Sequence, residues 1–373
     1  MTAVEAPALA TFVLPPDLEA TEPAEARGAG RDDVRLLVAH QATGQIEHHR
    51  FPELPDLLDA GDLLVVNTSA TVPAALAALD PDGVEVGVHL SGALPGSVWL
   101  AEVRRLTGPV GPDALTGPDA VTGPDAPSGT GPDPSDRTGQ TLLLPGGGRA
   151  HLLGRFAPGS RLWLADLELP ACARGDVLRF LAAYGEPIRY GYVTHPWPLT
   201  AYQNVYARVP GSAEMASAGR AFTPELITRL VARGVDMAPL VLHTGVSSQE
   251  SHEPPYPERY DVPLDTARRV NAARASGGRV IAVGTTVVRA LETVADARGQ
   301  VHPGQGWTEL MVTPAAGVRA VDGMLSGWHE PEATHLLMLE AVGGAELVAQ
   351  SYEEALAAGY LWHEFGDLHL LLP

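Results

Sequence analysis

Short apolar runs divided by glycine and proline dominate the chain up to about residue 170, and this pattern is typical of strands. The runs VRLLVAH, GDLLVVNTSATVPAAL and GVEVGVHL come first, and RLWLADLEL then alternates apolar and polar positions over nine residues. Residues 66–170 are therefore predicted to form an all-β unit, a small barrel or a sandwich.

From about residue 175 the pattern changes to strands that alternate with helices. One helical segment begins with Thr223 as a candidate N-cap, has Pro224 in its first turn and is followed by Gly234. The strands expected between the helices are MAPLVLHTG, RVIAVGTT and LHLLLP. This alternation predicts a largely parallel sheet that is covered by helices.

The two patterns together predict the domain organisation. Residues 1–65 do not complete a domain alone, so we place them with residues 175–373 in an α/β domain, a mostly parallel sheet with flanking helices. Residues 66–174 then form an inserted, small antiparallel β-barrel domain. Within it, residues 107–139 are rich in Gly, Pro and Asp, repeat the unit TGPDA and have almost nothing to bury, so we expect a disordered loop there.

Composition narrows the class of protein. The 373 residues carry 45 acidic and 25 basic side chains, a formal net charge of −20, and this charge repels polyanions such as nucleic acids. Cys172 is the single cysteine, which excludes an intramolecular disulfide and a four-cysteine zinc site. The first residues resemble no secretory signal, and no stretch approaches the ~20 apolar residues of a membrane span, so we expect a soluble, cytoplasmic protein without a membrane partner.

The clearest candidate for a binding site is RVIAVGTTVVRALE, residues 279–292. A buried strand ends at Gly284, and Thr285 and Thr286 open a helix whose first amides have no partner within the helix. Such a helix start attracts a carboxylate, a phosphate or another polar group, and Arg289 one turn later could add a forked contact. The alternative is that Thr285 is only an N-cap and Arg289 only a surface residue.

Two further segments place chemistry-bearing residues beside predicted elements. His243 and Thr244 follow a hydrophobic strand, where the carboxyl ends of α/β strands bind ligands, although a lone histidine is more often structural. His329 lies in a loop just before a helix.

Aromatic residues concentrate between residues 188 and 207, in a chain with only 6% aromatic residues. The cluster consists of Tyr190, Tyr192, Trp197, Tyr202 and Tyr206. Aromatic faces hold nucleobases and also cations such as a sulfonium. The alternative is packing around a proline-stiffened loop between domains.

Metal sites and several common motifs find no support in the sequence. The pairs His48–His49 and His252–Glu253 lack the i, i+4 spacing that places two zinc ligands on one helix face. The chain has no P-loop, no GxGxxG after a strand and no GxSxG. We therefore expect no metal, and neither a P-loop ATPase, a typical dinucleotide enzyme nor an α/β hydrolase.

Several segments, in order along almost the whole chain, resemble the S-adenosylmethionine:tRNA ribosyltransferase-isomerase family of queuosine biosynthesis. They include GDLLVVNT, AYQNVYARVPGSAEMASAGRAFT, LVLHTG, VGTTVVRALE, GWHEP and FGDLHLLL, of which GDLLVVNT and VGTTVVRALE are the most specific. The resemblance implies an α/β domain with an inserted β-barrel and a cleft between them. That cleft would bind S-adenosylmethionine as a co-substrate.

The resemblance also implies an activity. In that family the ribosyl group of S-adenosylmethionine goes to the aminomethyl group of a 7-deazaguanine in tRNA, adenine and methionine leave, and the sugar is rebuilt as an epoxycyclopentane. His243 and Thr244 would then lie near the reacting ribose, with His243 the leading candidate for proton transfer and His329 a second one. The residues that bind the co-substrate would be Tyr190, Tyr192, Tyr202, Gly284, Thr285, Thr286 and Arg289. The threonines and Arg289 would hold the methionine carboxylate, and the tyrosines would face adenine or the sulfonium.

Departures from the family pattern keep other functions open. Ala221 stands where the family has a histidine, and HTGVSSQ keeps only His243 and Gly245 of its segment. Two arginines of the segment VNTSATVPAAL are also missing, and the net charge of −20 disfavours tRNA as a partner. The alternatives are a paralogous enzyme that uses S-adenosylmethionine or a related nucleoside on a small acceptor, and a non-catalytic binding protein.

Overall fold

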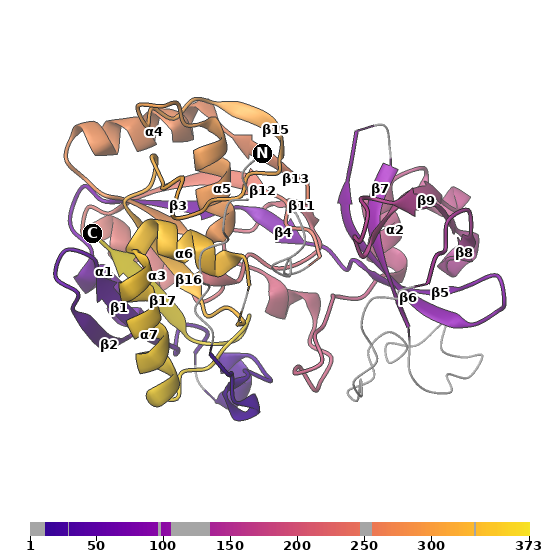
Figure 1. Cartoon of the computed structure of the whole chain (residues 1–373), viewed down its shortest axis with the longest axis horizontal. Coiled ribbons are helices and arrows are strands. Elements are labelled where there is room, and N and C mark those ends of the chain that lie inside the picture. Colours follow the sequence, from indigo (N-terminus) through magenta and orange to yellow (C-terminus); the bar gives the residue numbers. More distant parts are fainter. Residues whose placement is uncertain (1–11, 29, 96–97, 106–134, 247–255, 332) are drawn as a thin grey trace.

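The protein has a larger lobe of helices around a sheet and a smaller lobe that is a β-barrel (Figure 1). The structure, a computed structural model, describes residues 12–28, 30–95, 98–105, 135–246, 256–331 and 333–373. The two lobes confirm the predicted fold class, an α/β unit with an antiparallel barrel.

The sheet of the larger lobe contains nine strands from the described part of the chain. In spatial order these are β15 (Gly304–Thr308), β13 (Glu258–Val262), β12 (Asp236–Leu242), β3 (Leu63–Asn67), β14 (Val280–Val283), β16 (Gly323–Gly327), β17 (Leu368–Leu372), β1 (Arg35–His40) and β2 (Ile46–Arg50). The four strands β12, β3, β14 and β16 are parallel to one another, and β1 is parallel to β17.

The sheet is mixed rather than mostly parallel. β13 and β15 at one end, β2 at the other, and the pair β16–β17 are antiparallel. β2, β13, β15 and β16 were not predicted as strands from the sequence. Short polar strands such as IEHHR and ERYDV carry no apolar run, so their pairing depends on neighbours that sequence periodicity does not reveal.

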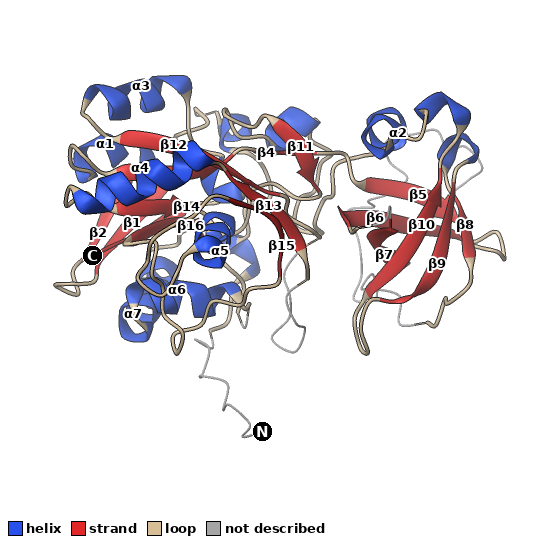
Figure 2. Cartoon of the chain, turned by 90° about the horizontal axis from the view of Figure 1, so that it is seen from above, coloured by secondary structure: helices blue, strands red, loops and turns tan. Residues whose placement is uncertain are grey.

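Helices cover both faces of this sheet, because the buried strands present apolar side chains to both sides. Along β1, Leu36 and Val38 belong to one apolar core, and Leu37 and Ala39 belong to the other. One face is covered by α1 (Leu54–Leu57) and α3 (Pro224–Ala232), the other by α4 (Leu264–Ala275), α5 (Thr285–Val294), α6 (His335–Gly343) and α7 (Ala345–Ala357) (Figure 2). Among these described helices, none has the length and apolar character that a membrane crossing requires.

The smaller lobe is a closed antiparallel barrel. Its strands, in chain order, are β5 (Ala75–Leu79), β6 (Glu85–Ala93), β7 (Val98–Arg105), β8 (Thr141–Leu143), β9 (Arg149–Arg155) and β10 (Leu162–Glu168). Phe180 and Leu181 of α2 (Val177–Tyr184) join the barrel core, although α2 lies beyond residue 174. Of the loop predicted at 107–139, residues 107–134 lie outside the described residues.

A short ribbon and a few side chains join the lobes. β4 (Ser69–Thr71), which follows β3, pairs in parallel with β11 (Val209–Ser212) on the chain's way back from the barrel. The Val246 amide donates to Ser91 Oγ of the barrel at 2.9 Å, and Trp307 Nε1 donates to the Ala93 carbonyl at 3.1 Å. The barrel is thus held beside the edge of the sheet at which β3 ends.

His369 is a histidine in the centre of the larger lobe. It lies on β17, is fully buried and stacks on Trp328 with ring centroids 4.8 Å apart. Neither ring nitrogen has a hydrogen-bond partner within the described ranges. Burial lowers the pKa of His369 from 6.5 to about 3, so the folded protein keeps this ring neutral.

Replacing His369 by phenylalanine should make the protein less sensitive to acid. Because the unfolded chain binds a proton near pH 6.5 and the folded chain does not, the stability contributed by His369 is complete above pH 6.5 and falls as the pH drops towards 4. Between these values the His369→Phe variant should lose about 2 kcal/mol less unfolding free energy than the parent. Urea unfolding at several pH values measures this, with His302→Gln at a side chain 58% exposed as the control. Equal pH dependence of parent and His369→Phe would contradict the prediction.

Candidate active site

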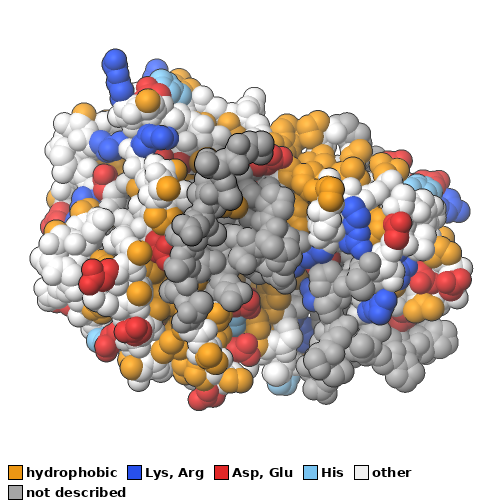
Figure 3. All heavy atoms as spheres, in the orientation of Figure 1, with side chains coloured by type: hydrophobic (Ala, Val, Ile, Leu, Met, Phe, Trp, Pro, Cys, Tyr) orange, Lys and Arg blue, Asp and Glu red, His pale blue; other side chains and the backbone are white. Residues whose placement is uncertain are grey.

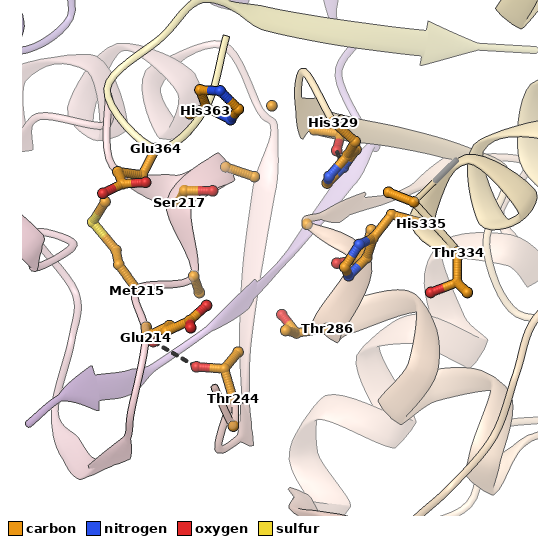
Figure 4. Close-up of a pocket in the computed structure, with 18 of the residues that line it drawn as sticks. Glu214, Met215, Ser217, Thr244, Thr286, His329, Thr334, His335, His363 and Glu364 are labelled. Carbon is orange, nitrogen blue, oxygen red and sulfur yellow. Dashed lines mark hydrogen bonds between the residues drawn. The ribbon is translucent and has the colours of Figure 1, made fainter. Parts of the chain in front are cut away.

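A cavity of about 240 Å³ lies at the edge of the sheet where β12, β14 and β16 end. Its walls come from residues that follow these three strands, from the segment after β11 and from the loop before β17. A further wall comes from residues 188–207, the aromatic segment. Polar residues from distant parts of the sequence therefore face one space, at the edge where α/β sheets bind ligands (Figure 4).

The start of α5 forms the floor of the cavity. Gly284 is its N-cap residue, with φ +95°, and no side chain caps the helix, so Thr285 is not the cap that the simpler interpretation assumed. Gly284, Thr285 and Thr286 all line the cavity. Asn67 at the end of β3 donates to Thr286 Oγ1 at 3.2 Å and fixes that side chain. The first turn of the helix thus faces the cavity without a side-chain cap.

Arg289 also lines the cavity, but its guanidinium is already occupied by protein groups. It forms an ion pair with Glu258, whose other oxygen accepts the Gly245 amide at 3.0 Å. It also donates to the carbonyls of Leu310 at 3.1 Å and Thr308 at 3.3 Å. Arg289 therefore ties α5 to β13 and to the chain after β15, and the role of ligand anchor predicted for it stays a prediction.

His243 and Thr244 have different positions. His243 is not among the lining residues, its Nδ1 lies 2.7 Å from Ser69 Oγ, and burial lowers its pKa to about 4. Thr244 lines the cavity, and its hydroxyl donates to the carbonyl of Glu214. Thr244 therefore positions the segment that carries Glu214, whereas the proton-transfer role predicted for His243 remains untested.

One wall of the cavity carries two tyrosine–glutamate pairs. The Tyr190 hydroxyl donates to Glu214 and the Tyr192 hydroxyl donates to Glu364. Tyr192 also packs against two other rings, Tyr190 at 5.6 Å and His363 at 4.1 Å between centroids. Burial raises the pKa of Glu364 from 4.5 to about 7, in spite of the hydrogen bond from Tyr192.

The opposite wall carries two neutral histidines. His329 Nε2 lies 2.8 Å from Ser326 Oγ, and the ring stacks on His335 with centroids 4.7 Å apart. Burial lowers the pKa of His335 to about 4 and that of His329 well below its ordinary value. Figure 4 shows these histidines facing Glu214 and Glu364 across the cavity. Proton-accepting groups of two kinds therefore enclose the same space.

Comparisons with known proteins agree with this architecture. Residues 9–371 match the model of a family described as "Queuosine biosynthesis protein". The chain belongs to this family.

Curated relatives extend over nearly the whole chain. A protein from Symbiobacterium thermophilum named S-adenosylmethionine:tRNA ribosyltransferase-isomerase is 36% identical over 369 residues, covering 97% of this chain and 98% of its own length. A protein of the same name from Thermotoga maritima is 33% identical with the same coverage. The crystal structure of S-adenosylmethionine tRNA ribosyltransferase from Thermotoga maritima is similar at 29% identity, with a TM-score of 0.51 over 97% of this chain and 99% of that chain. The resemblance inferred from the sequence is thus confirmed at the level of the family.

Sequence reasoning missed Glu214, Glu364, His335 and His363 among the residues that line the cavity. His363 and Glu364 come before β17, and because β17 is antiparallel to β16 its start lies beside the end of β16. A search restricted to the ends of parallel strands therefore overlooks them. The pair His363–Glu364, which three residues separate from the final apolar run LHLLL, was the available signal.

Two other predictions concern the histidine that Ala221 replaces and the absence of a metal site. Ala221, which stands where the family pattern has a histidine, is 5% exposed, packs in the core with Phe222 and does not line the main cavity. Among the described residues, no group of three or more His, Cys, Asp or Glu could hold a metal ion.

Replacing Arg289 by methionine should destabilise the fold, because it leaves Glu258, whose side chain is 13% exposed, without its counter-ion. We expect a loss of about 3 kcal/mol in unfolding free energy. The double variant Arg289→Met with Glu258→Met should recover most of this loss. Denaturant unfolding of both variants measures it, and unchanged stability of Arg289→Met would argue for the ligand role that the sequence predicted.

Proposed function

We propose that this protein transfers and isomerises the ribosyl group of S-adenosylmethionine onto a 7-aminomethyl-7-deazaguanine in tRNA, with release of adenine and methionine. The observation that carries the proposal is the full-length match to the queuosine biosynthesis family, combined with a polar cavity at the edge of the sheet where β12, β14 and β16 end. All but one of the site residues predicted from the sequence line that cavity.

The chemistry of a sulfonium substrate fits the groups in the cavity. A positively charged sulfur makes the neighbouring C5′–H more acidic, so a general base is needed, and the departure of adenine needs a hydrogen-bond donor or acid. His329 lines the cavity, is neutral at pH 7 and has its Nε2 beside Ser326, which favours it over His243 for proton transfer. Tyr190 is the best placed of the three tyrosines to face adenine, since Tyr192 already contacts two rings and Tyr202 is 3% exposed.

The arginines supply the chemistry for a tRNA partner despite the net charge. All 25 basic side chains are arginines, whose planar fork binds phosphate through two hydrogen bonds. In Figure 3 basic side chains gather on the barrel beside the middle of the molecule, and several of the chain's arginines belong to barrel segments, including Arg104, Arg105, Arg149 and Arg155. We propose that the barrel side contacts the tRNA backbone. The net charge of −20 favours the alternative, a small acceptor.

Incubation with S-adenosylmethionine and a tRNA that carries the 7-aminomethyl-7-deazaguanine should release adenine and methionine in equal amounts. Chromatography of the small molecules measures this, and a tRNA with guanine at the same position is the control that should give no release. Raising the salt concentration should lower the rate, because contacts between arginine and phosphate weaken. Adenine release with a small primary amine but not with tRNA would establish the alternative, and no release with either would overturn the proposal.

Removing the imidazole of His329 should reduce turnover far more than removing that of His243. We expect kcat to fall by about 100-fold or more in His329→Asn, as for the loss of a general acid or base, and by only a few-fold in His243→Asn. Single-turnover assays with saturating S-adenosylmethionine separate this effect from binding. If the two variants behave in the reverse way, His243 acts in proton transfer as the sequence analysis predicted.

A further inference from the structure

His329 lies in the connection between β16 and α6, outside any regular element. A residue in such a connection has no neighbouring strand or helical turn to hold its backbone. Within the described part of the chain, the His329 backbone makes two hydrogen bonds, and both are with side chains, 23 and 33 residues further along the sequence. The place of its imidazole in the cavity (Figure 4) therefore depends on these two side chains.

Tyr352 holds the amide of His329. It lies on α7, is 1% exposed, and its hydroxyl oxygen accepts the His329 amide at 3.2 Å. Its ring packs edge-on against Trp328, with centroids 4.9 Å apart, and against Phe12 at 5.3 Å. Because a close-packed ring keeps one orientation, the hydroxyl is fixed at the position that the amide requires.

Trp362 holds the carbonyl of the same residue. It is fully buried, and its indole Nε1 donates to the His329 carbonyl at 3.0 Å. Its own amide donates to the Leu18 carbonyl at 2.8 Å, which fixes the backbone of the segment. The next two residues, His363 and Glu364, belong to the opposite wall of the cavity. One residue thus ties His329 to the wall that it faces.

The imidazole of His329 has two contacts of its own. Its Nε2 lies 2.8 Å from Ser326 Oγ, and its face stacks on His335 with the ring planes 13° from parallel. Ser326 belongs to β16, whose pairing with β17 fixes it. These contacts restrict how the ring is turned, whereas the two backbone hydrogen bonds restrict where it lies.

Proton transfer depends steeply on the position of the group that accepts the proton. A general base must come within hydrogen-bond reach of the proton, and a displacement of about 1 Å can cost about 100-fold in rate. Neither Tyr352 nor Trp362 lines the cavity. Loss of either hydrogen bond should therefore affect the rate of the reaction much more than the binding of its ligand.

We propose that Tyr352 and Trp362 are positioning residues for His329. The inference rests on the proposed function and deepens it. Each side chain acts through the backbone of His329, without touching the space that a ligand would occupy, and together they keep the imidazole at the cavity. The precision of the proton transfer then originates in the apolar core behind the cavity wall.

Tyr352→Phe keeps the ring and removes only the oxygen that accepts the His329 amide. Its kcat should fall by about tenfold, whereas its affinity for S-adenosylmethionine, measured by calorimetry, should change by less than about threefold. Tyr360→Phe is the matched control, because Tyr360 is also 1% exposed and packs against Trp328, but its hydroxyl is bonded to His48 Nδ1 at 2.9 Å. The kcat of this control should stay within about twofold of the parent.

A double variant tests whether Tyr352 acts through His329. In the His329→Asn background, Tyr352→Phe should lower kcat by less than about twofold, because no imidazole remains to be displaced. A further tenfold loss in that background would overturn the inference, and so would equal losses of kcat in Tyr352→Phe and Tyr360→Phe. Trp362→Phe, which removes the indole N–H, should repeat the result of Tyr352→Phe and decides if thermal unfolding shows that Tyr352→Phe does not fold.

Chemical labelling separates this inference from the proposed function. If the parent releases no adenine with any acceptor, the proposed function fails, and the reaction of His329 with diethyl pyrocarbonate, followed by peptide mass spectrometry, then decides the inference. His329 should react about threefold faster or more in Tyr352→Phe than in the parent or in Tyr360→Phe, because the loop that carries it opens more often. His302, whose side chain is 58% exposed, is the internal reference. Equal labelling of His329 in the three proteins would show that the hydroxyl does not hold it.

Discussion

The parallel pairing of β3 with β12 and β14 is the constraint on which the arrangement of the site depends. β3 delivers the chain to the edge of the sheet at which β12, β14 and β16 also end, and the chain continues from that edge into the barrel. The barrel must therefore stand beside this edge. The returning chain passes through the aromatic segment and β11 before α3 carries it to the start of β12. The cavity is enclosed because the route out of the sheet and the route back to it run along the same edge.

Burial determines the chemical character of what this edge collects. The same loss of water contact acts in opposite directions on acids and bases, raising the pKa of Glu364 to about 7 and lowering that of His335 to about 4. Each shift favours the uncharged form of the side chain. The cavity accordingly presents neutral imidazoles on one wall and carboxyl groups sensitive to a nearby charge on the other, without any arginine or lysine within its described lining that is not already paired.

The sequence carried enough information for the elements with strong local signals. Thr223 caps α3, its side chain accepting the Leu226 amide, and Pro224 opens the helix, because these preferences act within a single turn. Gly284 ends a buried strand at a left-handed backbone angle, as a strand-to-helix transition of this kind requires. The all-β character of residues 66–170 was predicted from short apolar runs divided by glycine and proline and from the alternation of RLWLADLEL, whereas the choice of a barrel over a sandwich came from the family resemblance.

Partners distant in the sequence could not be foreseen. Arg289 was expected to bind a ligand because it lies one turn into the helix that begins at the candidate site, yet Glu258, on a polar strand that was not predicted from the sequence, pairs with it instead. Glu364 was missed because its position depends on the direction of β17, which is determined by pairing and not by its own residues. Short-range sequence signals were thus sufficient to predict where the cavity lies. Which charged side chains surround it could not be predicted without knowing how the strands pair.

His363 shows what the geometry of this wall demands of the chain. Its backbone has φ +72°, a left-handed conformation that costs a side-chain-bearing residue about 1–2 kcal/mol and that glycine adopts freely. Glycine would relax the loop but would remove the imidazole on which Tyr192 stacks, and with it the support of the ring that holds Glu364. At position 363, therefore, glycine would give the more stable loop and histidine gives the more ordered cavity wall. The chain has histidine, at the cost of a strained backbone.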